Sequence, residues 1–81
     1  MQLTNAANVA IPAIKLLRDL GYTIRLARPH GLFTAEKDGN RFSSDDPVAV
    51  LGLVRLYEAR GEDWGIEDAA LQDIGREFGL L

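Results

Sequence analysis

The chain has 81 residues, 47% of them hydrophobic and 26% charged, which is the composition of one folded, water-soluble domain and not of a disordered segment. It contains no cysteine, so disulfides and thiolate-bound zinc are excluded, and no apolar run approaches the roughly 20 residues that cross a bilayer. The net charge of −3 is uneven, because residues 1–41 carry +3 and residues 42–81 carry −6. This asymmetry marks either an interaction surface or two ordinary solvated faces.

The N-terminal part predicts a flexible lead-in and then an amphipathic helix. Residues 1–8 are polar or small without a period, so we expect them to be flexible at the start of a single domain that spans residues 1–81. Residues 11–20 predict a helix because apolar residues recur at the spacing of one helical face. These residues are Ala13, Leu16, Leu17 and Leu20. Gly21 then supplies the left-handed conformation that ends many helices.

Residues 22–43 predict three short antiparallel strands. The first two, over residues 22–28 and 32–37, are separated by a Pro-His-Gly turn, and a third, over residues 40–43, follows the hairpin dipeptide Asp38-Gly39. The alternation of apolar and polar residues indicates that the sheet has one buried face and one wet face. The residues expected to point inward are Tyr22, Ile24, Leu26, Phe33, Ala35 and Phe42.

A second helix is predicted directly after the sheet. Asp45 and Asp46 suit the cap of a helix whose first residue is Pro47. Residues 48–60 are apolar around most of this helix, so we expect it to be the central element, packed on the sheet and touched by both other helices. Gly52 within it is expected to allow the close approach of a neighbouring element, which would offset its low helix propensity.

Residues 66–78 predict the third helix, and residues 79–81 form a short tail that can dock through its leucines. The apolar stripe of this helix consists of Ile66, Ala70, Leu71, Ile74 and Phe78. Trp64 is interpreted first as a staple packed on the first helical turn, because a small core needs the area of an indole. The alternative is an exposed anchor for a partner. The whole pattern predicts an α+β fold in the order α-β-β-β-α-α, with a three-stranded antiparallel sheet covered on one face by helices.

The residue types that most enzyme and metal sites need are missing. His30 is the only histidine, and Asp38-Gly39-Asn40 lacks the alternating acids of a calcium loop. Nucleophilic catalysis needs a nucleophile, a base and an orienting acid, whereas His30 lies in a Pro-Gly turn that suits a solvent-facing residue. The eight glycines are scattered and form no phosphate-binding loop. We therefore expect no catalytic site, no metal and no cofactor. A carboxylate-based enzyme or a small-ligand binder stays open as an alternative.

The order of one helix, three antiparallel strands and a second helix over residues 12–60 resembles that of double-stranded-RNA-binding domains. Those domains hold duplex phosphates with basic residues at the start of the helix that follows the sheet. Here that position is occupied by Ser44-Asp45-Asp46-Pro47, which carries negative charge. The resemblance is therefore one of topology, and it implies no binding residue.

The leading hypothesis is a small cytoplasmic protein-interaction module, an adaptor, inhibitor or regulator that binds another protein through the polar face of its sheet. A cytoplasmic location is expected because the start of the chain lacks the basic and apolar regions of a secretory signal. A homodimer formed through a sheet edge belongs to the same hypothesis, and no membrane partner is expected. Weak nucleic-acid binding by the basic hairpin is the alternative, which the acidic net charge disfavours. The candidate partner-binding residues are Thr23, Arg25, Arg28, His30, Thr34, Glu36, Lys37 and Arg41.

Overall fold

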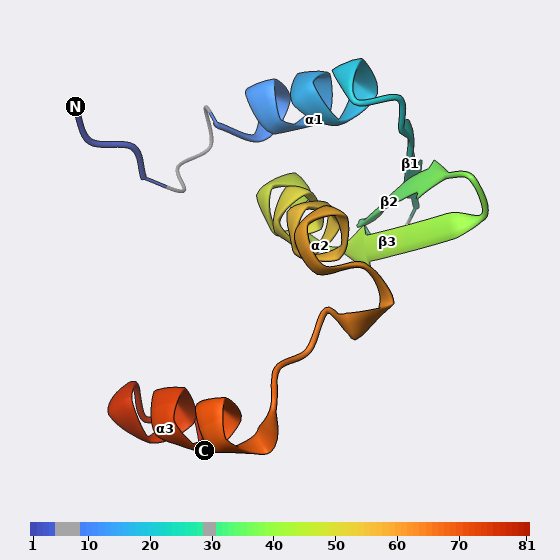
Figure 1. Cartoon of the computed structure of the whole chain (residues 1–81). Coiled ribbons are helices and arrows are strands. Elements are labelled where there is room, and N and C mark those ends of the chain that lie inside the picture. Colours follow the sequence, from blue (N-terminus) through green and yellow to red (C-terminus); the bar gives the residue numbers. More distant parts are fainter. Residues whose placement is uncertain (5–8, 29–30) are drawn as a thin grey trace.

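The computed structural model describes residues 1–4, 9–28 and 31–81, and it confirms the predicted α+β class and element order. The elements are α1 (Ala10–Asp19), β1 (Thr23–Ala27), β2 (Leu32–Lys37), β3 (Asn40–Ser44), α2 (Pro47–Arg60), the 3₁₀ turn η2 (Gly61–Asp63) and α3 (Asp68–Glu77). The strands form an antiparallel sheet in the order β1-β2-β3, and α1 and α2 pack against it and against each other (Figure 1). Residues 5–8, half of the predicted lead-in, and the turn residue His30 lie outside the described residues.

The core lies between the sheet and the first two helices. Its fully buried side chains come from α1, β2 and α2, and they are Leu17, Ala35, Val50 and Val54. Tyr22 closes one side of this cluster, and Phe42 packs its ring edge-on against Tyr22 at 6.1 Å between centroids. The predicted inward direction of Ile24, Phe33, Ala35 and Phe42 is confirmed, because all four contact or belong to this cluster.

Local sequence signals set the ends of the elements as expected. After α1, the N–H of Gly21 (φ 96°) donates to the carbonyl of Arg18 at 2.9 Å, and the N–H of Tyr22 donates to that of Leu17 at 3.0 Å. This is the Schellman pattern of a helix C-terminus. Between β2 and β3, both Asp38 and Gly39 have positive φ, as a two-residue hairpin turn requires.

The surroundings of α2 differ from the prediction. Only Pro47, Val50 and Val54 are buried, whereas Leu53 and Leu56 on its outer side are each 41% exposed. The predicted close neighbour of Gly52 is also absent, since a Cβ at that position would meet nothing within 4 Å. The prediction that both other helices touch α2 is wrong, because α3 lies apart from α2 and the sheet (Figure 1). An apolar pattern identifies a helix face that is stabilised by burial, but it does not identify the element or molecule that buries it.

Two leucines that were predicted to point inward are exposed as well. Leu16 of α1 is 45% exposed and Leu26 of β1 is 38% exposed. Both lie at the margin of the sheet–helix core, which has too few elements to cover every apolar side chain of its own pattern.

The N-terminus of α2 gives a direct test of the fold. The carboxylate of Asp46 accepts a hydrogen bond from the N–H of Val48 at 2.9 Å, and Pro47 follows it as the first helical residue. We predict that Asp46→Ala lowers the free energy of unfolding by about 1 kcal/mol, because the cap is lost, whereas Asp46→Asn retains most of it. Urea denaturation measures both. The matched control Asp45→Ala should change stability by less than about 0.5 kcal/mol, and equal effects of the two alanine variants would contradict this role of Asp46.

Candidate functional site

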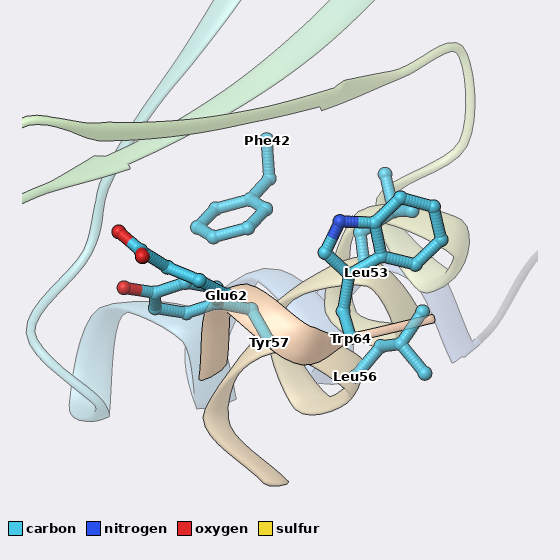
Figure 2. Close-up of a pocket in the computed structure, with 6 residues that line it drawn as sticks. All are labelled: Phe42, Leu53, Leu56, Tyr57, Glu62 and Trp64. Atoms are coloured by element: carbon cyan, nitrogen blue, oxygen red, sulfur yellow. The ribbon is translucent and has the colours of Figure 1, made fainter. Parts of the chain in front are cut away.

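An apolar pocket of about 390 Å³ opens beside the outer side of α2. Three consecutive parts of the chain line it: β3, α2 and the turn that follows α2 (Figure 2). The lining residues are Phe42, Leu53, Leu56, Tyr57, Glu62 and Trp64. The rings of Phe42 and Tyr57 lie 5.6 Å apart between centroids and form one wall. Apart from Glu62 and the hydroxyl of Tyr57, every side chain in this set offers apolar surface or an aromatic ring, so the pocket is suited to apolar groups.

Trp64 forms the outer wall of the pocket and is 59% exposed. In Figure 2 its indole stands beside Leu53 and Leu56 of the preceding helix. The staple interpretation of Trp64 is therefore wrong, because a staple would bury the indole on the first turn of α3. The exposed indole is the feature that the alternative, a partner anchor, requires.

Arg60 fixes the turn that carries Trp64. Its guanidinium donates to the carbonyl of Gly65 from two nitrogens, at 2.8 and 3.2 Å, and to the carbonyl of Asp63 at 3.3 Å. Gly61 (φ 64°, ψ −144°) ends α2 in a conformation that strongly favours glycine. The direction in which the chain leaves α2 is therefore set by these hydrogen bonds and by this residue.

The pocket continues along α2 as an exposed apolar stripe. Ala49, Gly52, Leu53 and Leu56 are spaced by three or four residues along this helix, and all four are exposed. Residues at this spacing share one helical face. The stripe and the pocket together form one surface on the side of α2 that faces away from the core.

Helix α3 carries a second apolar face that its own chain does not cover. Leu71, Ile74 and Phe78 are 45%, 48% and 66% exposed, and Ile66 just before the helix is 39% exposed. The tail folds back on this helix, where the N–H of Leu80 donates to the carbonyl of Gly75 at 2.7 Å. The side chain of Leu81 then covers Gly75, the one buried residue of α3. We call α3 with residues 78–81 the C-terminal arm.

The open face of the sheet holds five of the residues predicted from sequence. The strand register aligns Arg25 with Thr34, and it aligns Thr23 with Glu36 and Arg41 across the three strands. Because neighbouring strand partners point to the same side, these residues share the face opposite the core. Thr34 and Ser43 share a hydrogen bond of 2.9 Å, and Arg41 lies 3.5 Å from Glu36. The face is therefore polar and partly paired with itself.

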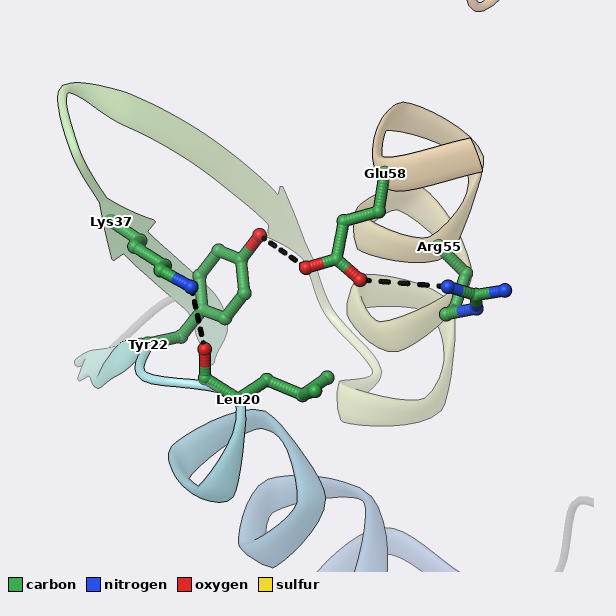
Figure 3. A network of polar contacts seen from close by, with 5 residues as sticks. All are labelled: Leu20, Tyr22, Lys37, Arg55 and Glu58. Atoms are coloured by element: carbon green, nitrogen blue, oxygen red, sulfur yellow. Dashed lines mark hydrogen bonds and ion pairs between the residues drawn. The ribbon is translucent and has the colours of Figure 1, made fainter. Parts of the chain in front are cut away.

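Arg28 and Lys37 do not belong to that open face. Arg28 is exposed beyond the end of β1. Lys37 reaches to the core side, where its Nζ donates to the carbonyl of Leu20 at 2.7 Å and lies 5.3 Å from the ring centre of Tyr22 (Figure 3). Lys37 thus helps to join the end of α1 to the hairpin. His30, the remaining candidate, lies outside the described residues.

The arrangement offers little positive charge for nucleic acid. Lys37 is directed to the core side and Arg41 is paired with Glu36, so Arg25 is the one basic side chain of the open face for which the described residues provide no ion pair. Among the described residues, no group of three or more histidine or acidic side chains is placed to hold a metal ion. Within the same residues, no helix combines the length and the apolar character that crossing a membrane requires.

Tyr22 links the sheet side of the core to α2. Its hydroxyl donates to the carboxylate of Glu58 at 3.2 Å, and Glu58 in turn lies 3.6 Å from Arg55 (Figure 3). Burial raises the pKa of the Tyr22 phenol above its ordinary value of 10.0, and the negative charge of Glu58 raises it further.

This pKa shift predicts an alkaline loss of stability. A phenol with a raised folded-state pKa contributes stability that is complete below pH 10, the unfolded value, and is lost as the pH rises through the folded value. We predict that the free energy of unfolding of the natural chain falls more steeply above pH 10 than that of Tyr22→Phe. Urea denaturation at a series of pH values measures this, and Glu58→Gln should give an intermediate slope. Identical pH profiles for the natural chain and Tyr22→Phe would contradict the shift.

Comparison of the chain with known proteins identifies no relative. No protein-family model matches the chain, and neither a curated protein nor a solved structure matches it.

Proposed function

We propose that the chain is a small protein-interaction module that acts by binding polypeptide, with no catalytic site of its own. The observation that carries the proposal is a pair of exposed apolar surfaces, one made of the α2 stripe and the pocket with Trp64, the other the face of the C-terminal arm. Contiguous apolar patches of this kind on a small chain mark surfaces that another molecule covers. The exposed indole adds the residue type that most often anchors protein interfaces.

The open face of the sheet supplies a second, polar recognition surface. Arg25, Thr34 and Ser43 form one row across the strands, and Thr23, Glu36 and Arg41 form another. Polar and charged groups of this kind contribute specificity and association rate more than affinity. In this proposal, the apolar surface provides most of the binding energy, and the sheet face selects among partners.

The proposal is tested by capture with matched surface variants. The tagged chain is incubated with nuclease-treated lysate of the source cell, beside Leu53→Glu/Leu56→Glu and Arg25→Glu/Arg41→Glu. We predict that bound protein survives nuclease treatment and falls at least about tenfold with the α2 variant, because charge enters a surface that must be dehydrated. A smaller loss is expected with the sheet variant.

Three outcomes would contradict the proposal or part of it. Binding that disappears on nuclease treatment would support the nucleic-acid alternative. Binding that neither variant changes would show that both surface assignments are wrong. A chain that retains no protein and does not self-associate is not an interaction module. Far-UV circular dichroism of each variant verifies that the fold is kept, which is expected because all four side chains are exposed.

A further inference from the structure

The C-terminal arm and the apolar pocket are two unmatched apolar surfaces of one chain. The arm presents Leu71, Ile74 and Phe78 on one face of a helix, and α2 presents a stripe beside a pocket. Ala49 and Gly52 are exposed and have little or no side chain, so the backbone of another helix could approach the α2 stripe closely. Each surface offers apolar side chains that the other one could cover.

A helix as short as α3 needs a surface to pack on. It has 10 residues, and isolated helices shorter than about 12–15 residues are marginal in water. The N-cap residue that precedes it, Glu67, provides no side-chain hydrogen bond for the first N–H groups. Packing of its apolar face is therefore the main available source of stability for this helix.

The geometry of the connection directs the arm away from its own pocket. The three hydrogen bonds from Arg60 hold the turn at Asp63 and Gly65, and α3 leaves that turn away from α2 (Figure 1). In this arrangement the arm does not lie on its own α2 (Figure 1). A pocket on another copy can receive the arm with the turn unchanged.

We propose that two copies of the chain exchange their C-terminal arms, so that α3 of each copy packs on the α2 stripe and pocket of the other. This inference rests on the proposed function and identifies the polypeptide that the apolar surface binds as a second copy. When two copies exchange their arms with each other, the pair closes with two-fold symmetry; an arm passed on to a third copy would instead build an open chain.

The exposed apolar area is large enough for a stable dimer. The large apolar residues of the two surfaces together expose an area on the order of 900 Å² per chain. A stable interface buries roughly 800 Å² per partner, so the exposed area is of the required size. The large apolar residues of the two surfaces are Leu53, Leu56, Trp64, Ile66, Leu71, Ile74, Phe78, Leu80 and Leu81. Exchange would cover most of this area without a contribution from any other protein.

Sedimentation velocity of the purified full chain over about 1–100 µM tests the proposal, because dimer formation follows mass action. We predict a shift from the mass of one chain to that of two with rising concentration. An arm variant, Ile74→Glu/Phe78→Glu, and a pocket variant, Leu53→Glu/Leu56→Glu, should each weaken the dimer by about 30-fold or more. The matched control Gln72→Glu, on the polar side of α3, should dimerise like the natural chain.

Mixing the two variants distinguishes exchange from other dimers. The arm variant has an intact pocket and the pocket variant has an intact arm, so the mixture can form a pair with one native arm–pocket contact. We predict that the mixture associates at concentrations where each variant alone is a monomer. A mixture that stays monomeric while the natural chain dimerises would overturn arm exchange in favour of another dimer interface.

A natural chain that is monomeric throughout this range would overturn the second copy as occupant. If the monomeric chain still captures a different protein through Leu53 and Leu56, the proposed function stands and only this inference fails. If it captures nothing, both fail.

Discussion

The packing of Val50 and Val54 of α2 against Ala35 of β2 is the contact on which the rest of the structure depends. All three residues are 1% exposed or less, and together with Leu17 of α1 they join both helices to the sheet. Once these valines face the sheet, the helical geometry of α2 directs Ala49 and Leu56 away from the sheet and places Leu53 on the flank of the helix. The exposed stripe is thus a consequence of the core, since one helix face packs on the sheet and the other has no third layer above it.

That missing layer connects the fold to its proposed function. In many small α+β domains the last helix would cover such a stripe, and the apolar face of α3 has the pattern to do so. The turn held by Arg60 instead carries α3 away from the core, so both apolar surfaces stay open. A chain that exposes both the α2 stripe with its pocket and an apolar helix that could pack on it is suited to exchange between copies. A dimer of this type would display two polar sheet faces for further partners.

The sequence predicted local structure well and tertiary contacts less well. Gly21, Asp38-Gly39 and Asp46 act within a few residues of themselves, so their signals were sufficient to place a helix end, a hairpin and a cap. The five residues of the open sheet face followed from the period of two along each strand.

Predictions that depend on contacts between residues far apart in the sequence were less successful. Lys37 looked like an exposed cation of the hairpin, but its long side chain reaches the carbonyl of Leu20, 17 residues earlier in the chain. The pocket was missed because Phe42, Leu53 and Trp64 are dispersed in sequence and come together only through the turn after α2. Two signals in the sequence point to this site, namely the apolar residues around most of α2 and the single tryptophan, but both are equally typical of an internal core.

The most direct test of this account is amide hydrogen exchange of the full chain at low and high concentration, read out by residue. Amides of β2 and of the Val50–Val54 segment should be protected at both concentrations, because they belong to the core of each copy. Amides of α3 should exchange rapidly at low concentration and become protected only as the dimer forms. Equal, strong protection of α3 at low concentration would contradict the account, because it would mean that the helix is already packed on its own chain.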